Sequence, residues 1–154
     1  MKIYLVRHGA AQLKSVDPAR PLTERGRQDV QRVAAYMGRL GLEVHQIRHS
    51  NKTRAEQTAT IFGESLCPPG GVVAVSGLAP NDDVRPVAND LMRQSQPVML
   101  VGHLPFLARL AGLLLTGDPN RHVMRFCEVG TVCLARQGDR WLVAWILTPE
   151  MAGA

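Results

Sequence analysis

The stretch Lys2-Ile3-Tyr4-Leu5-Val6-Arg7-His8-Gly9 joins a short apolar run to an abrupt polar ending. A run of this length that is bounded by polar residues is typical of a buried β-strand. Ligands of parallel sheets bind beyond the carboxyl ends of the strands, so the residues that follow Val6 are candidates for a functional site. The run is too short for a secretion signal or a membrane span, and we therefore expect a cytoplasmic protein without membrane contact.

Downstream of this strand, predicted helices and strands alternate. Helices are expected from Thr23 to Gly41, from Ser50 to about 66, over 83–95 and from Pro105, and strands over 45–49, 72–75, 97–101, 131–135 and 141–147. The order β-α-β-α-β-α-β-α-β-β predicts the α/β class, as a three-layer α/β/α sandwich with a mainly parallel sheet and an antiparallel element near the end. At 154 residues, we expect one domain that spans 1–154.

Several local features are also predicted. Thr23 is expected to cap the first helix, whose apolar face comprises Val30, Val33, Ala34, Met37 and Leu40. A proline at residue 105 suits the first turn of its helix. Trp141 and Trp145, at an even spacing, are expected to pack on one face of their strand. Residues 151–154 are expected to be frayed.

Three of the predicted strands end in residues that are unusual for loops. Arg7-His8-Gly9 follows the first strand, Ser50 leads from the second strand into a helix whose first turn holds Arg54, and Gly102-His103 follows the strand over 97–101. These ends should meet on one edge of the sheet and bring two arginines and two histidines together. Guanidinium groups bind phosphate through paired N–H donors, and a neutral imidazole is a nucleophile near pH 7. The set predicts phosphoryl chemistry, with the glycine relieving a sharp turn.

Other patterns favour no further chemistry. The net charge of +5 suits an anionic partner, but with 5% aromatic residues and no basic run we expect no nucleic-acid binding. His45 and His49 have the spacing of a helical zinc site but fall in a predicted strand, so we expect no metal and no cofactor. His122 should lie in a surface loop. The cysteines are expected to be small core residues rather than disulfide partners: Cys67, Cys127 and Cys133.

Taken with their neighbours, these motifs resemble the histidine phosphatase superfamily, whose members open with R-H-G. The segment Arg20–Gly26 resembles the approach to that family's first helix, Arg54–Ala59 matches its R-A-x-Q-T-A helix, and Val101–Pro105 resembles its later histidine motif. The resemblance implies the phosphoglycerate mutase-like fold of that family and a metal-independent phosphatase. It implies that His8 becomes a phosphohistidine intermediate, while Arg7, Arg54 and a protonated His103 bind the phosphoryl oxygens of a phosphate-sized anion.

Within this family, the stretch Gly77–Val84 departs from the mutases and small-molecule phosphatases. It lacks their acidic L-x-E and G-x-W-E-G patterns, and Ala10 replaces the glutamate of R-H-G-E. The pattern is similar to that of the compact SixA-type phosphohistidine phosphatases, which implies a phosphorylated protein as substrate. Asp82 or Asp83 could serve as a general acid, although turn and helix-cap roles explain both equally well.

Two alternatives stay open at this stage. The first is a phosphomonoesterase acting on a sugar phosphate or nucleotide, with Asp82 or Asp83 donating the proton. The second is a non-catalytic phosphate-binding adaptor that keeps the fold. Retention of every member of the arginine–histidine set favours an enzyme over the adaptor.

Overall fold

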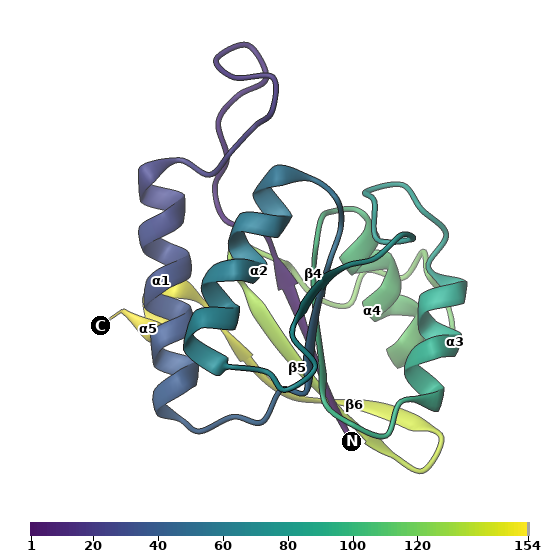
Figure 1. The fold of residues 1–154 in the computed structure, drawn as a ribbon. Helices are drawn as coiled ribbons and strands as arrows, with labels where there is room; N and C mark the ends of the chain where they lie inside the picture. Colours follow the sequence, from purple (N-terminus) through teal and green to yellow (C-terminus); the bar gives the residue numbers. More distant parts are fainter. Residues whose placement is uncertain (154) are drawn as a thin grey trace.

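A six-stranded sheet lies between two layers of helices in the computed structural model, which describes residues 1–153 (Figure 1). The strands are β1 Lys2–Arg7, β2 Gln46–His49, β3 Val72–Ala74, β4 Val98–Gly102, β5 Thr131–Gln137 and β6 Arg140–Leu147. The helices are α1 Glu24–Arg39, α2 Thr53–Leu66, α3 Arg85–Arg93, α4 Phe106–Thr116 and α5 Pro149–Ala152.

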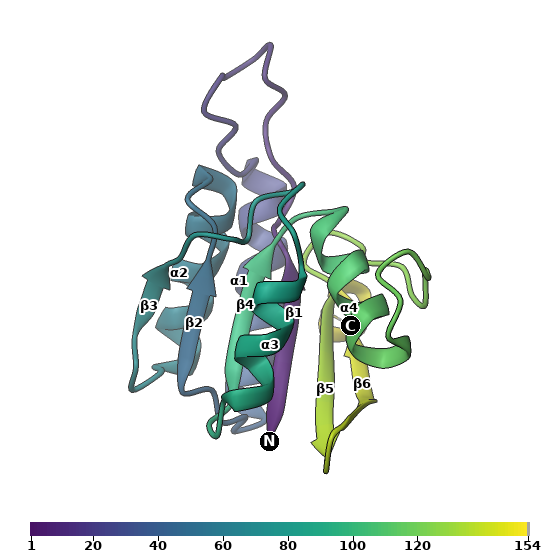
Figure 2. The same cartoon turned by 90° about the vertical axis from the view of Figure 1, so that its right-hand side faces the viewer.

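The strand order is β3-β2-β4-β1-β5-β6. β1, β2, β3 and β4 pair in parallel, whereas β5 pairs antiparallel with both β1 and β6. Figure 2 shows the parallel strands pointing toward the same end of the molecule. The predicted three-layer α/β/α sandwich, with an antiparallel element near the end, is confirmed.

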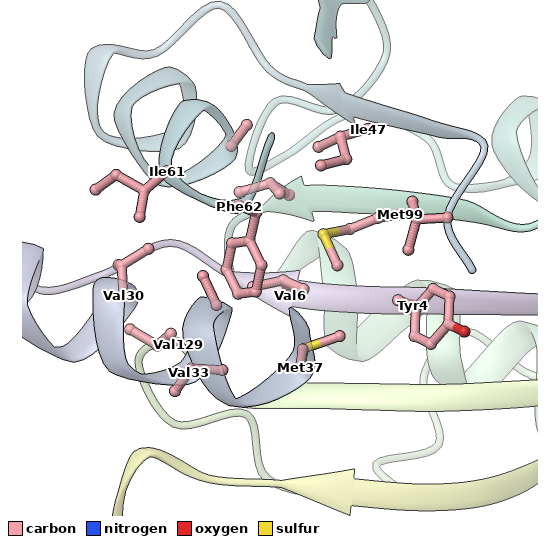
Figure 3. Close-up of a cluster of buried hydrophobic side chains, with 14 of the residues drawn as sticks. Tyr4, Val6, Val30, Val33, Met37, Ile47, Ile61, Phe62, Met99 and Val129 are labelled. Atoms are coloured by element: carbon pink, nitrogen blue, oxygen red, sulfur yellow. The ribbon is translucent and has the colours of Figure 1, made fainter. Parts of the chain in front are cut away.

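Each face of the sheet has its own apolar core. On one face, α1 and α2 pack on Tyr4, Val6 and Met99 around the fully buried Phe62 (Figure 3). On the other face, α3 and α4 cover the opposite side chains of the same strands, such as Leu5 and Leu100. Because β1 and β4 are buried on both faces, their sequences are continuously apolar rather than alternating.

Helix α1 begins as predicted, because the Thr23 hydroxyl accepts a hydrogen bond from the Gly26 N–H at 2.9 Å. The rest of its predicted apolar face is buried, but Leu40 lies at the C-cap and is 55% exposed. The helical spacing of apolar residues extends one position beyond the helix to Leu40, which does not pack against the core. Gly41, at φ 65°, ends the helix as expected.

The prediction for the C-terminal segment was wrong. Residues 149–152 form the short helix α5, whose Ala152 is buried against α1, while residue 154 lies outside the described residues. The prediction that Trp141 and Trp145 share a face was also wrong. The register between β5 and β6 shifts at Cys133/Leu134, so one extra residue in β6 sends Trp141 and Trp145 into opposite cores.

Two smaller expectations changed as well. Pro105 is the N-cap of α4 rather than a residue of its first turn. Of the three free cysteines, only Cys133 is a core residue, because Cys67 and Cys127 lie in exposed turns. His122 is exposed in a loop, as predicted. Within residues 1–153, no helix combines the length and apolar character needed to cross a bilayer.

Candidate active site

Strand register places the predicted motifs side by side. Arg7 of β1 pairs with Gly102 of β4, so His8 and His103 are the next residues on two adjacent strands. β2 flanks β4 on its other side, with His49 opposite Val101, which brings Ser50 level with the same edge. The rings of His8 and His103 lie 5.1 Å apart between centroids and are tilted by 52°.

Backbone hydrogen bonds hold both His8 and the residue before it. The His8 N–H donates to the Gly102 carbonyl at 3.0 Å, and the Val129 N–H donates to the Arg7 carbonyl at 3.0 Å. Val129 is fully buried with φ 60°, a strained conformation for a β-branched residue that its surroundings must impose. The surrounding contacts therefore hold the backbone next to His8 in place despite the energetic cost of this conformation.

Gly9 is needed for a different reason than a sharp turn. Its φ is not positive, and a Cβ built on it would lie 2.8 Å from Val30 Cγ2 and 3.1 Å from the Gly26 carbonyl. Close packing of the chain against α1 therefore explains this glycine. The Gly9 N–H donates to the buried Thr58 hydroxyl at 3.1 Å, which ties the segment to α2.

The hydrogen bonds of His8 define its tautomer. Nδ1 lies 2.7 Å from the Gly9 carbonyl oxygen, so this nitrogen must hold a proton and donate it. Nε2 is then unprotonated, and its lone pair accepts a hydrogen bond from Arg54 Nε at 3.3 Å. The arrangement exposes a nucleophilic nitrogen directly to a guanidinium group.

His103 is held by Ser50. Its Nε2 lies 2.6 Å from the Ser50 hydroxyl, and both residues are almost completely buried. The His103 Nδ1 and the Arg7 Nε are buried without a hydrogen-bond partner among residues 1–153. Buried polar atoms nearly always have partners, so these two suit a site that binds an oxyanion. The other end of the Arg7 side chain donates to the Phe126 carbonyl at 3.0 Å.

Arg20 adds a further positive charge that the sequence analysis did not assign to the site. Burial is the main cause of the lowered pKa values of His8, Arg54 and His103, and the charge of Arg20 contributes to each. Its backbone is left-handed, with φ 49°, and its Nε donates to the Gln12 carbonyl at 3.1 Å. The signal available in the sequence was an arginine at the start of the Arg20–Gly26 motif.

Thr58 and Gln57 are two further residues whose roles were missed. The Thr58 hydroxyl accepts from the Gly9 N–H and donates to the Arg54 carbonyl at 2.8 Å. The Gln57 side-chain oxygen accepts from the Leu22 N–H at 2.8 Å and so holds the return of the loop that follows His8. A hydroxyl on an otherwise apolar, buried helix face needs such partners.

Burial and like charge keep both imidazoles neutral. The pKa of His8 falls to about 4, mainly through burial and partly opposed by the Gly9 hydrogen bond, with the charges of Arg54, Arg7 and Arg20 lowering it further. The pKa of His103 falls to about 3 through burial first, then the charges of His8, Arg54, Lys52 and Arg20. The protein's own charges thus oppose the predicted protonation of His103.

Asp82 and Asp83 have structural partners. The Asp82 carboxylate accepts from the Ala79 N–H at 2.9 Å within a turn, and the Asp83 carboxylate accepts from the Arg85 N–H at 3.0 Å at the start of α3. Both bonds are the turn role considered from the sequence, whereas the helix-cap role is not formed, because the N-cap of α3 is Val84. Among residues 1–153, no group of three or more histidine, cysteine, aspartate or glutamate side chains is placed to hold a metal ion, and His49 instead contacts the Ser50 carbonyl.

The sequence model of the histidine phosphatase superfamily (branch 1) matches residues 3–78, which include the R-H-G segment and α2. The chain belongs to the histidine phosphatase superfamily. The resemblance inferred from the motifs is therefore confirmed, together with the fold it implied.

Comparison with individual proteins of this superfamily points to the SixA type. Phosphohistidine phosphatase SixA of Escherichia coli strain K12 is 29% identical over 123 residues, which cover 77% of this chain and 76% of SixA. A solved structure of the protein histidine phosphatase SixA complexed with tungstate has a TM-score of 0.85 at 25% identity, with 97% of each chain covered. Family and likeness to SixA together make this chain a phosphatase, a hydrolase that acts on phosphoryl groups.

The fold is shared with small-molecule phosphatases as well. The native structure of mycobacterial glucosyl-3-phosphoglycerate phosphatase has a TM-score of 0.72 at 17% identity, and the match covers 93% of this chain and 96% of that one. This likeness shows the fold alone, so the substrate has to be argued from the site.

Proposed function

We propose that this histidine phosphatase removes the phosphoryl group from phosphohistidine on a protein, with His8 as the nucleophile. The observation that supports this most directly is the tautomer of His8. Nδ1 donates to the Gly9 carbonyl, so Nε2 is unprotonated and its lone pair faces Arg54, from which it accepts a hydrogen bond. A neutral imidazole held in one tautomer can attack phosphorus without first losing a proton.

The reaction proceeds in two balanced steps. The His8 Nε2 forms a bond to phosphorus as the P–N bond of the substrate breaks, and the departing ring, protonated on its other nitrogen, leaves as neutral imidazole. Water then adds to phosphorus, the P–N bond to His8 breaks, and phosphate leaves with both hydrogens of the water. No metal takes part in either step of this proposal, and no cofactor is required.

Fixed positive charge supplies the stabilisation of both transition states. Arg54 donates to the nucleophilic Nε2, Arg7 precedes His8 with its buried Nε unpartnered, and the charge of Arg20 acts on the same ring. A phosphoryl dianion against the His103 ring would raise the pKa of that histidine. Protonation would then accompany binding, with the Nδ1 of His103 free to donate to an oxygen.

The surroundings of the leaving group favour a phosphoramidate over an ester. An alkoxide needs a proton from a general acid, whereas an imidazole protonated on its distal nitrogen leaves unaided. Asp82 and Asp83, the acids that such a reaction would use, each accept a backbone N–H bond in the turn before α3. The likeness to SixA supports the same substrate class.

A substrate panel tests the proposal. We expect a histidine-phosphorylated protein to be hydrolysed with a kcat/KM far above that for sugar phosphates, and chelator to leave the rate unchanged. Faster turnover of sugar phosphates would refute the substrate class. In that case the esterase alternative predicts that Asp82→Asn or Asp83→Asn strongly lowers ester hydrolysis.

Trapping the intermediate tests the role of His8. Acid-labile labelling of the wild type by a ³²P-phosphorylated substrate should be lost in His8→Asn and retained in His122→Asn, which changes an exposed loop histidine instead. Labelling of His8→Asn at the wild-type level would rule out His8 as the phosphoryl acceptor. A complete absence of label and turnover in the wild type would favour the adaptor alternative.

A further inference from the structure

A long loop between β1 and α1 stands beyond the carboxyl ends of the strands, at the end of the sheet where the site lies (Figures 1 and 2). Its base is closed by an antiparallel bridge between Ala11 and Leu22, and we refer to residues 11–22 as the rim loop. It begins two residues after Gly9 and contains Arg20, whose charge acts on both active-site histidines. The base of the rim loop is thus part of the site's border.

The backbone of the rim loop is fixed by hydrogen bonds within the loop. The Gln12 N–H donates to the Pro21 carbonyl at 2.8 Å near the base. At the tip, the Leu13 carbonyl accepts from the N–H groups of Val16 and Asp17 at 2.9 and 3.0 Å. The Asp17 side chain accepts from Ala19 at 3.0 Å. The loop therefore has a defined shape before any partner is present.

This defined loop presents apolar side chains to solvent. Leu13 is 66% exposed and Val16 is 68% exposed, more than any other large apolar residue that the structure describes. Two such residues at one ordered tip, next to a site, differ from the scattered apolar residues found on every surface. Their burial against another molecule would be favourable, and nothing in the fold of residues 1–153 covers them.

The charge around the rim is positive apart from Asp17, whose carboxylate accepts the bond from Ala19. Lys14 is exposed at the tip, Arg20 lies at the base, and Lys52 lies near His103 at the start of α2. None of the salt bridges among residues 1–153 includes these three cations. A complementary partner would present an apolar patch bordered by carboxylates.

We propose that the tip of the rim loop, Leu13 and Val16 with Lys14 beside them, is a docking surface for the protein that bears the phosphohistidine. This inference rests on the proposed function and adds a second contact to it. Five residues separate Ala11 from Val16, so the tip lies at most about 18 Å from the bridge. A protein domain of 100 residues, with a radius of gyration of about 13 Å, can touch the tip and the site at once. A free phosphoramidate occupies the anion site alone.

The test compares a protein substrate with a small one in the same variants. The protein probe is an acidic phosphotransfer domain with one surface histidine, phosphorylated with potassium phosphoramidate, and the small probe is N-phosphoimidazole. We expect the double variant Leu13→Ser/Val16→Ser to lower kcat/KM for the protein about tenfold or more, mainly through KM. Its turnover of phosphoimidazole should stay at the wild-type level, which also shows that the variant folds.

Leu40→Ser is the matched control, because Leu40 is 55% exposed at the far end of α1. This variant should behave as wild type on both probes. Equal effects of the rim-loop variant on the two probes, or none on either, would overturn the docking surface and leave the proposed function standing. A wild type that hydrolyses phosphoimidazole but not the phosphoprotein would overturn the protein substrate and the docking surface together.

Discussion

The lowered pKa of His8 predicts a specific acid sensitivity of the fold. Burial and neighbouring cations lower this pKa from its ordinary value of 6.5 to about 4 in the folded protein. Above pH 6.5 the ring is neutral in both the folded and the unfolded chain and adds no pH dependence. Between pH 6.5 and 4 only the unfolded chain takes up the proton, so the free energy of unfolding falls as the pH falls.

The size of the effect follows from the same two values. Each pH unit between them costs about 1.4 kcal/mol, so a fall from pH 6.5 to pH 5 should remove about 2 kcal/mol of stability through His8. His103, with a pKa lowered to about 3, acts in the same direction and adds to the loss. Against a typical stability of about 5–15 kcal/mol, a loss of this order is readily measured.

Urea unfolding, followed by the fluorescence of Trp141 and Trp145, measures this loss at pH 7 and at pH 5 in phosphate-free buffer. We expect His8→Asn, which removes the ring but keeps a polar side chain, to lose about 2 kcal/mol less than the wild type over this range. His122→Asn replaces an exposed histidine and should follow the wild type. Parallel losses in the wild type and in His8→Asn would refute the assignment of a buried, neutral His8.

Three further outcomes are expected. Arg20→Gln should weaken vanadate or tungstate binding about 10-fold, which corresponds to about 1.4 kcal/mol and can be measured by competition against substrate; unchanged affinity would place Arg20 outside the anion site. Thr58→Val should cost about 1–3 kcal/mol of stability, because it leaves the buried Gly9 N–H without an acceptor, whereas the exposed Thr60→Val should cost little. Gly9→Ala should cost about 1–3 kcal/mol, because its Cβ would lie 2.8 Å from Val30; a thermal melt like that of the wild type would contradict the packing argument.

The sequence predicted the order of helices and strands well, because each element leaves its own local pattern. The Thr23 cap and the apolar run of β1 were recognisable from a few neighbouring residues. The errors arose where the outcome depends on a distant partner. A register shift in β6 separated Trp141 and Trp145, and the packing of Ala152 on α1 ordered a segment expected to be frayed.

For the site, the motifs identified the residue types and the edge of the sheet on which they lie. They did not show that Thr58 bonds the backbone next to His8, that Ser50 holds His103, or that Arg20 reaches the site. The first two relationships join residues 49 and 53 positions apart, and only the strand order and register bring them within bonding distance.

From its amino acids alone, this chain can be assigned its family, its class of fold and the edge on which its arginines and histidines meet, because short-range periodicity and motif spacing are written in neighbouring residues. The tautomer of His8, the neutral state of both imidazoles and the orientation of the rim loop arise only on folding. Each depends on how far a group is removed from water and on which charges then lie beside it. Burial and proximity of that kind belong to the folded chain and to no segment of it.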